Sequence, residues 1–565
     1  MKKQCKPRIF ISVHFFTLFI LLYYFSIRSL WFGISRYTIP AMPFILLAVI
    51  VFCSFATTLC FINKTYPVCL AIPVFFIDCF FLIVNSFICS VILYALPYFI
   101  REFFYGVFYL LLLWILYFAI VRLPKLRFFQ TKWFPSLILT LLLTVGFLLH
   151  FRIPFYNSIS SVPVVYAVGN TYQIVFTSHA KGTGWVTIDG VDYSDTYAGY
   201  QRSETNVHKI TVPMAALDGT GEYTISTSSM LFRSLYGVIQ GKTYQKTYQW
   251  KGLTPEDGLQ YYVLSDTHNT QKTPAAAASY FGDSLDLLIC CGDAASWVDR
   301  ESDLTQTLRL AGAITGGRVP VIYARGNHET KGLQAHQLYR YVSADEENFY
   351  YTFRIKNVWG IVLDIGEDHG DRYPDYCGTA KFNAYRRAQT AFLDEVLENA
   401  QKEFDAPGVD YRIGVCHIPL TIKYSNDHAA AYKDAWIRRL NKMKLTVLFS
   451  GHVHQLWYID DRFEDGATLT LASHYRDGKK DSSSRIMTNA KFPSILVSRR
   501  SKGQSLSYPE EPFDTAFIGL AVTADKFKTT MKYTTEKGAV LDNIVCPWYE
   551  NIEYGSEITI QNKKE

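Results

Sequence analysis

The sequence predicts a multi-domain chain: an N-terminal α-helical transmembrane bundle, then a β-sandwich, then an α/β domain. Three observations support this. Apolar residues crowd the first part of the chain, short alternating strands follow, and longer apolar runs then alternate with helical segments. The 565 residues leave room for three or four domains of ordinary size. We predict domains at 1–152, 155–251 and 258–540, and a C-terminal tail at 541–565.

The amino-terminal region contains four uncharged apolar stretches, each close to the ~20 residues that a helix needs to cross a bilayer. They run from about Ile9 to Ile27, Ile39 to Ile62, Phe103 to Val121 and Phe134 to Phe151. A longer stretch from Tyr66 to Ile100 carries one acid, Asp78, and is interpreted as a single tilted span. We therefore expect about five helices, with four or six as alternatives. A signal peptide has one short apolar run and does not explain this pattern.

Basic residues flank these stretches unevenly. Four precede the first stretch and four lie between the fourth and fifth: Lys2, Lys3, Lys6 and Arg8, then Arg122, Lys125, Arg127 and Lys132. The positive-inside rule then places the amino terminus in the cytoplasm and everything after about residue 151 outside. We expect an integral, multi-pass plasma-membrane protein with an extracytoplasmic soluble part. An even number of spans would place that part inside.

Residues 155–251 have the pattern of a β-sandwich similar to fibronectin III. Segments such as TYQIVFTSH and EYTISTSSM alternate apolar and polar residues, and Gly, Asp and Asn interrupt them at roughly 8–12-residue spacing. The segment contains no cluster of catalytic residue types, so we expect it to space or position the domain that follows. Residues 252–258 are the predicted linker.

Five short motifs in the third domain each follow a strand-like apolar run. They are Asp266-x-His268, Gly292-Asp293, Gly326-Asn327-His328-Glu329, His417, and Gly451-His452-Val453-His454. Setting Glu329 aside, they supply two carboxylates, one amide and five imidazoles, which are the oxygen and nitrogen ligands that suit a pair of divalent metals. In layered α/β folds, loops at strand ends gather the functional side chains. The sequence therefore predicts a two-metal site.

The order and context of the five motifs give the segment from Leu259 to Tyr533 a resemblance to the calcineurin-like metallophosphoesterase superfamily, which implies α-β-β-α layers. The preceding sandwich is similar to the arrangement in purple acid phosphatases. Two positions depart from that subfamily: His268 stands where those enzymes have Gly, and Ser296 where they place a metal-binding Tyr. The iron–tyrosinate chemistry of purple acid phosphatases is therefore not expected.

The resemblance implies a role for each motif residue. Asp266, His268 and His454 would hold one metal, Asn327, His417 and His452 the other, and Asp293 would bridge both. A hydroxide shared by two divalent cations (Mn, Fe, Zn or Co) would attack phosphorus. His328 would be the general acid that protonates the leaving oxygen, with Glu329 orienting it. Arg325 is either a phosphate contact or part of a structural ion pair.

Single motifs have simpler explanations. Asp293 alone could cap a helix, Asn327 and His328 could form an ordinary turn, and His417 could be a loop histidine. The full ordered set favours the metal interpretation. Among the cysteines, Cys290, Cys291 and Cys416 lie on predicted core strands and are expected to be inert thiols. Whether Cys377 and Cys546 pair stays open.

These patterns predict a membrane-anchored, metal-dependent phosphoric ester hydrolase. Its substrate would be a phosphate mono- or diester of a small molecule, a cell-envelope precursor or a lipid head group. The alternatives are a pyrophosphatase or nucleotide phosphodiesterase with the same metals, and a non-catalytic membrane receptor or scaffold. The net charge of +6 is modest, and no basic patch with interleaved aromatics is present, so nucleic acid is not an expected partner.

Overall fold

The computed structural model describes residues 158–562, except for 235–236, 254–257, 377, 425–426 and several stretches after residue 454, the longest being 470–483 and 501–514. The chain divides into two units, Met1–Ile153 and Pro154–Glu565. The predicted membrane helices, Cys377 and Cys546 lie outside the described residues. Within the described part, no helix is both long and apolar enough to span a bilayer.

The first large sheet contains three parallel strands that lead into the predicted site. In spatial order its strands here are β26 (Ile558–Gln561), β23 (Lys528–Thr535), β22 (Phe517–Ala524), β9 (Leu259–Leu264), β10 (Leu287–Cys290) and β11 (Pro320–Tyr323), and β21 (Arg499–Arg500) pairs with β22. Strands β9, β10 and β11 are parallel, and β22 is antiparallel to β9. Every residue of β10 and β11 is buried, as expected for apolar strands covered on both faces.

The second sheet supplies the remaining motif strands. Its order is β12 (Tyr351–Ile355), β13 (Val358–Leu363), β14 (Tyr411–Cys416), β16 (Val447–Ser450), β20 (Ser494–Leu496) and β17 (Trp457–Ile459). The four strands β13, β14, β16 and β20 are parallel, and β12 and β17 are antiparallel to their neighbours at the two edges.

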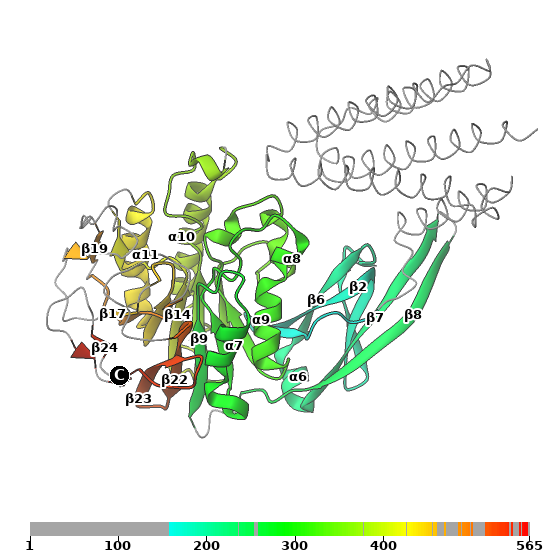
Figure 1. Ribbon diagram of the computed structural model, residues 1–565, viewed down its shortest axis with the longest axis horizontal. Helices are drawn as coiled ribbons and strands as arrows, with labels where there is room; N and C mark the ends of the chain where they lie inside the picture. Colours follow the sequence, from blue (N-terminus) through cyan, green and yellow to red (C-terminus); the bar gives the residue numbers. More distant parts are fainter. Residues whose placement is uncertain are drawn as a thin grey trace, which may run out of the picture. The chain divides into compact units, whose positions relative to one another are not determined.

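Helices cover the outer faces of the two sheets. One core joins Leu288 of β10 to Leu308 of α9 (Gln306–Thr315) and includes α7 (Lys272–Ala278), whereas the next residue, Ile289, belongs to a core shared with the second sheet. A third core packs the second sheet against α10 (Phe382–Glu398) and α11 (Ala430–Met443). Figure 1 shows α10 and α11 on one side of the sheets and α7 and α9 on the other. The predicted mixed α/β layering is therefore confirmed.

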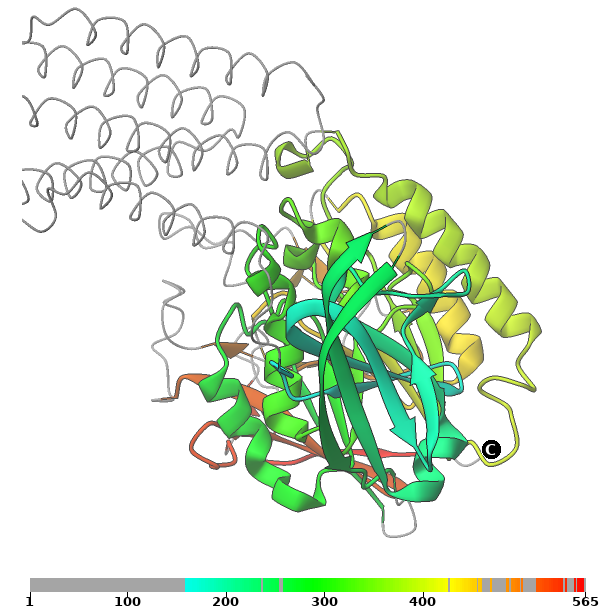
Figure 2. The same ribbon diagram turned by 90° about the vertical axis from the view of Figure 1, so that its right-hand side faces the viewer.

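The preceding strand-rich segment continues the first sheet. Its strands are β1 (Val164–Val168), β2 (Thr171–Ile188), β3 (Val191–Ser194), β6 (Thr205–Pro213), β7 (Glu222–Ser234) and β8 (Gly237–Gln249). Strand β1 pairs in parallel with β11, so strands from both sides of the predicted linker belong to one hydrogen-bonded sheet. Figure 2 shows the long strands of this segment, coloured cyan to green, in the foreground. The strand-rich character is as predicted. The segment shares a sheet with the domain that follows, because β1 completes the β11 edge, and its arrangement as a two-sheet sandwich stays a prediction.

The C-terminal residues also belong to this architecture. The predicted closing strands are β22 and β23, beside β9. Residues 541–565, expected to be a tail, contribute β26 to the same sheet, so that expectation is corrected. The remaining strands form small pairs: β4 (Thr196–Tyr197) with β5 (Tyr200–Gln201), β15 (Ile422–Lys423) and β18 (Thr468–Leu469) with β19 (Ser484–Ile486), and β24 (Ile544–Val545) with β25 (Glu553–Tyr554). Short helices are α6 (Met214–Thr220), α8 (Glu301–Leu304), η5 (Ser279–Ser284), η6 (His328–Thr330), η7 (Ala335–Arg340) and η8 (Pro374–Tyr376).

Candidate metal centre

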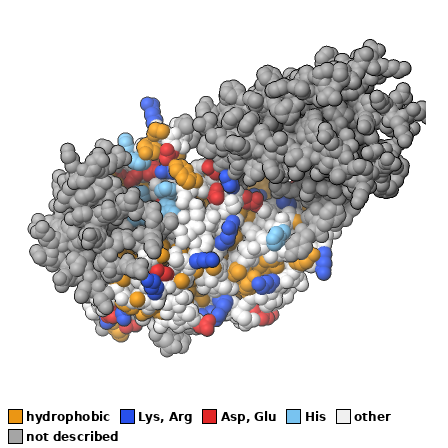
Figure 3. All heavy atoms as spheres, in the orientation of Figure 1, with side chains coloured by type: hydrophobic (Ala, Val, Ile, Leu, Met, Phe, Trp, Pro, Cys, Tyr) orange, Lys and Arg blue, Asp and Glu red, His pale blue; other side chains and the backbone are white. Residues whose placement is uncertain are grey.

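All of the predicted ligands lie just beyond the carboxyl ends of parallel strands. Asp266 and His268 follow β9, Asp293 follows β10, Asn327 and His328 follow β11, His417 follows β14, and His452 and His454 follow β16. The carboxyl ends of parallel strands meet at one edge of a layered sheet, so five loops distant in sequence converge there. Figure 3 shows His and acidic side chains gathered together on one part of the surface.

The backbone at these loops is unusual. Five predicted ligands have a left-handed φ, between 42° and 72°: Asp266, His268, Asp293, His452 and His454. They are five of the eleven non-glycine residues with positive φ in the described part of the chain. Such conformations disfavour ordinary side chains and concentrate at functional sites, where the surrounding structure imposes them. Backbone geometry therefore singles out the same residues as the motifs.

Two glycines allow the loops to approach one another. A Cβ at Gly451 would collide with the Ser265 hydroxyl and lie 2.5 Å from an Asp266 carboxylate oxygen. Gly292 has a φ of +88°, and a Cβ there would lie 2.5 Å from the Gly326 nitrogen and 2.9 Å from His417 Nδ1. These positions need glycine because a backbone and a ligand side chain occupy the space that a larger residue would fill.

The first ligand group consists of Asp266, His268 and His454. The Nε2 atoms of the two histidines are 3.1 Å apart and their rings are stacked, with planes only 2° from parallel. His454 Nε2 lies 3.5 Å from Asp266 Oδ1. Burial lowers the pKa of His268 to about 4, despite the neighbouring carboxylates of Asp293 and Asp266, so its imidazole is neutral near pH 7. A neutral imidazole is the form that binds a metal.

The second group consists of Asn327, His417 and His452. The Asn327 side-chain oxygen lies 3.2 Å from His417 Nε2 and 3.1 Å from His452 Nδ1. His417 donates its Nδ1 proton to the Cys291 carbonyl at 2.6 Å, which leaves Nε2 facing the cluster. A histidine held in this way by a backbone carbonyl is typical of metal ligands, because the bond fixes the tautomer and the ring orientation.

Asp293 lies between the two groups. Its Oδ2 atom is 3.9 Å from His268 Nε2 and 3.2 Å from His417 Nε2, and its side chain is almost completely buried. Its Oδ1 atom accepts the backbone N–H of His328 at 3.0 Å. One carboxylate oxygen therefore faces an imidazole from each group, which is the position of a ligand shared by two cations.

The donor set fits a pair of divalent cations. Within each of two triads, Asp266–His268–His454 and Asp293–His417–His452, the candidate ligand atoms all lie within 4.8 Å of one another. Nitrogen and oxygen atoms that can bind a cation thus lie close together in both triads. Neutral imidazole, carboxylate and amide oxygens are ligands for Mn, Fe, Co or Zn, so the chemistry of the site matches the predicted metals without selecting one.

His328 lies beside the cluster and not within either ligand triad described above. Its Nδ1 contacts the Ser296 carbonyl at 2.8 Å, so Nδ1 carries a proton and Nε2 points toward Asp293 Oδ2, 4.0 Å away. About 31% of the side chain is exposed, whereas Asp293 is buried. The ring packs edge-on against His268 and Trp297. His328 is therefore the most exposed imidazole of the five motifs.

Glu329 supports the site in a different way from that expected. Its buried carboxylate accepts backbone N–H groups from Asp293, Ala294 and Ala295 at 2.8, 2.6 and 3.1 Å, and from Gly326 at 2.7 Å. Glu329 thus joins the loop after β10 to the loop after β11. The Ser296 carbonyl, not Glu329, contacts His328. The prediction that Glu329 orients His328 is corrected on this point.

Arg325 takes the structural alternative. Its guanidinium lies 2.7 Å from the buried Asp364 carboxylate and over the Phe349 ring, 4.3 Å from the centroid. Both contacts hold the side chain inside the domain, because a buried guanidinium needs its charge partner. The interpretation as an ion pair is confirmed, and the structure gives no support to a phosphate contact.

Two acidic residues at the centre belong to none of the five motifs and were not predicted. Glu367 and Asp368 follow β13, in a run that reads as an ordinary strand, WGIVLDIGED. Asp368 Oδ2 lies 3.2 Å from His452 Nε2, and Glu367 Oε2 accepts from Asn327 Nδ2 at 3.4 Å. Their position could have revealed them, because they directly follow a buried parallel strand as the motif residues do.

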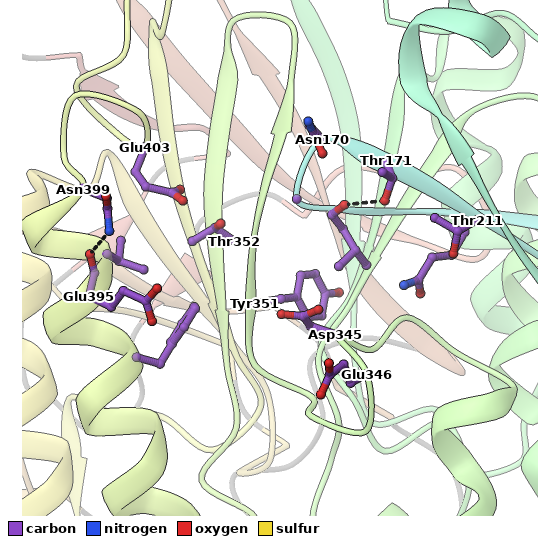
Figure 4. A pocket seen from close by; sticks show the side chains of 15 residues that line it. Asn170, Thr171, Thr211, Asp345, Glu346, Tyr351, Thr352, Glu395, Asn399 and Glu403 are labelled. Carbon is purple, nitrogen blue, oxygen red and sulfur yellow. Dashed lines mark hydrogen bonds between the residues drawn. The ribbon is translucent and has the colours of Figure 1, made fainter. Parts of the chain in front are cut away.

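The protein has a separate pocket of about 520 Å³ between the β1–β2 turn, β12 and α10. Figure 4 shows acidic side chains on its wall, with Asp345 and Glu346 on one side and Glu395 and Glu403 on the other. None of the predicted metal ligands lines this pocket. The three buried cysteines predicted to be inert, Cys290, Cys291 and Cys416, are free thiols in the core.

Comparison with known proteins agrees with the motif analysis. Residues 259–456 match the family described as calcineurin-like phosphoesterase. No curated protein sequence matches the chain. Among solved structures, a purple acid phosphatase from yellow lupin (Lupinus luteus) seeds is 14% identical, with 72% of this chain and 74% of that one covered and a TM-score of 0.41. PhoD is 10% identical, with coverages of 71% and 91% and a TM-score of 0.38.

The family match spans β9 to the end of the last motif, which is the segment that holds every predicted ligand. The cysteine-free donor set and the convergence at the strand ends are independent of that match, and they lead to the same class of site. The chain therefore carries a metallophosphoesterase domain of the calcineurin-like superfamily, the domain of a metal-dependent phosphoester hydrolase.

Proposed function

We propose that this protein is a membrane-anchored, two-metal phosphoesterase that hydrolyses phosphate mono- or diesters. One observation carries the proposal: the Asp266–His268–His454 and Asn327–His417–His452 groups converge on a single buried carboxylate, Asp293. An isolated structural metal would need only one such group. Two groups that share a carboxylate are the arrangement used to activate water and to hold both oxygens of a displacement at phosphorus.

Each part of the site has a role in this proposal. When bound, two divalent cations would neutralise phosphoryl oxygens and lower the pKa of a water shared between them. The chain holds the proton that the leaving group needs. His328 donates Nδ1–H to Ser296, so Nε2 is the atom free to carry a proton to the leaving oxygen. The Glu329 carboxylate keeps the loops of Asp293 and His328 at a fixed separation.

The location belongs to the same proposal. The apolar stretches before residue 152 would anchor the protein in the plasma membrane, and the basic residues flanking them favour an extracytoplasmic catalytic domain. Such a domain would meet phosphate esters of small molecules, cell-envelope precursors and lipid head groups, with membrane lipids as neighbours. The modest net charge of +6 does not favour a nucleic acid as a binding partner.

The test is phosphoester hydrolysis by the purified full-length chain. p-Nitrophenyl phosphate and bis(p-nitrophenyl) phosphate are assayed with Mn²⁺, after removal of metal by a chelator, and after Mn²⁺ is restored. We expect turnover of at least one ester that the chelator abolishes and Mn²⁺ recovers. Asp283→Asn is the control variant and should keep wild-type turnover, because Asp283 pairs with Arg318 at 2.9 Å and belongs to none of the ligand groups.

The same assay separates the alternatives. Hydrolysis of pyrophosphate or a nucleotide, with neither nitrophenyl ester cleaved, would replace the proposed substrate class with that of a pyrophosphatase or nucleotide phosphodiesterase. Two bound metals without turnover on any of these phosphates would favour a receptor or scaffold. Turnover that is indifferent to the chelator would contradict the proposal itself.

A further inference from the structure

Two adjacent carboxylates, Glu367 and Asp368, lie directly behind two ligands of the same proposed metal. Asp368 contacts His452 and Glu367 contacts Asn327, and both of these ligands belong to the second group. Neither acid belongs to the five motifs. The inference drawn from this pair rests on the proposed two-metal site and concerns how the chain prepares one half of it.

Asp368 determines which nitrogen of His452 is available. Its Oδ2 atom lies 3.2 Å from His452 Nε2, while His452 Nδ1 faces the Asn327 oxygen at 3.1 Å. An ionised carboxylate accepts hydrogen bonds and has no proton to donate. The contact therefore requires that His452 Nε2 carries the proton. The Nδ1 lone pair then points into the cluster, and the ring cannot turn without losing the bond.

Glu367 determines which end of the Asn327 amide faces the cluster. Its Oε2 atom accepts from Asn327 Nδ2 at 3.4 Å, which directs the amide oxygen toward His417 and His452. A reversed amide would present two N–H donors to a cation and leave Glu367 facing an oxygen. Lys331 and the Tyr376 hydroxyl each hold the same Glu367 oxygen at 3.0 Å, so the carboxylate stays in place.

The loop carrying both acids is fixed from behind by α10. Arg386 is fully buried and donates to the carbonyls of Ile365, at 3.0 Å, and of Glu367. Gln389 contacts both the N–H and the carbonyl of Asp364, at 2.8 and 2.7 Å. A buried guanidinium is costly unless it is fully bonded. Here two of its bonds go to the backbone of this loop and a third goes to Asn383 Oδ1 at 3.0 Å. Residues 364–368 therefore form a rigid support.

We propose that Glu367 and Asp368 are positioning residues that prearrange Asn327 and His452 and thereby set the affinity of the metal held by the second ligand group. Support of this kind is selective. Loss of a hydrogen-bond partner behind a metal ligand typically costs about 10- to 100-fold in metal affinity. The contacts of Asp368 and Glu367 described above go to His452 and Asn327, two ligands of the second group.

The experiment measures metal binding directly, beside activity. The full-length chain is freed of metal, titrated with Mn²⁺ by calorimetry, and followed by electron paramagnetic resonance, which distinguishes a coupled metal pair from a single ion. Asp368→Leu removes the acceptor but keeps the branched shape of the side chain, and Asp368→Asn restores an acceptor oxygen. Asp283→Asn, which removes a carboxylate paired with Arg318, is the control. Thermal unfolding of the metal-free proteins shows whether each variant is folded.

We expect Asp368→Leu to weaken one of the two Mn²⁺ sites by about 10- to 100-fold and to leave the other unchanged. At intermediate Mn²⁺ the single-ion spectrum should replace the coupled one, and turnover should recover at saturating metal. Asp368→Asn should regain most of the affinity, and Asp283→Asn should match the wild type. Equal weakening of both sites in Asp368→Leu, or no weakening, would overturn the inference. A wild-type chain that binds no pair of metals would instead overturn the proposed function.

Discussion

The two halves of the metal centre are held in different ways. In the second group, His417 bonds to the Cys291 carbonyl, His452 to Asp368 and Asn327 to Glu367, so each ligand has a partner behind it. In the first group, His454 has a buried Nδ1 without a hydrogen-bond partner among the described residues, and its ring stacks directly on His268. Each ligand side chain of the second half is thus oriented by a partner outside the cluster, whereas the imidazole of His454 in the first half has no such partner among the described residues.

This difference indicates that the two metal positions respond to different changes. Substitutions behind the second group should alter one metal, and substitutions of the shared ligand should alter both. Positioning partners matter because a ligand that already has its binding geometry loses no rotational freedom when the metal arrives. Variants can therefore separate the halves, and the shared carboxylate should have the largest effect.

The largest expected effect is that of Asp293→Asn. Asparagine keeps the size of the side chain but replaces the charge that faces both groups with a neutral amide. We expect both metals to bind more weakly and turnover to fall to background, because the Asp293 carboxylate faces both His268 and His417. Metal content after desalting and ester hydrolysis are the measurements. One metal retained at wild-type affinity would show that Asp293 serves only one half.

His328→Gln should have the next largest effect and should leave both halves intact. The ring touches the centre without joining either ligand group, so two metals should still bind. For alkyl phosphates, whose alkoxide is a poor leaving group unless it is protonated, we expect kcat to fall by about 10²- to 10⁴-fold. Nitrophenyl esters, whose leaving group needs little protonation, should be affected much less. Equal losses on both substrates would contradict the role as general acid.

The site was largely predictable because its signals are local. Each motif follows its own apolar strand within a few residues, so residues such as Asp266 and His417 could be identified without knowledge of the fold. Glu367 and Asp368 also follow a strand directly, but they belong to none of the motifs. Their role required coordinates, because it depends on contacts with ligands 40 and 84 residues distant in the sequence. The contact of Glu329 with neighbouring amides, in place of His328, also required coordinates.

The fold shows the same division between local and distant information. Alternating apolar and polar residues predicted strands in 158–249. Such alternation does not predict the order in which the strands pair in the sheet. The parallel pairing of β1 with β11 joins segments far apart in the chain, and it turned an expected separate domain into an extension of the first sheet. Likewise β26 lies in a segment too polar to suggest a strand in a buried sheet, and it pairs with β23 at the edge.

The two halves should differ in the number of protons that they release when a metal binds. Burial opposes a charge on His417, but the Asp293 carboxylate outweighs it and raises the pKa of His417 to about 10 in the metal-free chain, whereas burial lowers that of His268 to about 4. Near pH 7.5, a metal at the second group must displace a proton from His417, and a metal at the first group displaces none from His268. We therefore expect the affinity of one Mn²⁺ site to rise about tenfold per pH unit between pH 6.5 and 9, and the other to change little.

Calorimetry in buffers of different ionisation enthalpy measures how many protons the protein releases when each metal binds. The raised pKa of His417 also affects the stability of the metal-free protein. Because this folded-state pKa lies above the unfolded value of about 6.5, the protonated histidine stabilises the fold below pH 6.5, and this stabilisation is lost as the pH rises toward 10. Chelated protein should thus become less stable across the pH range in which the second metal binds more tightly. Two sites with the same proton release would show that the halves share one electrostatic environment, and the comparison between them would then rest on hydrogen bonding alone.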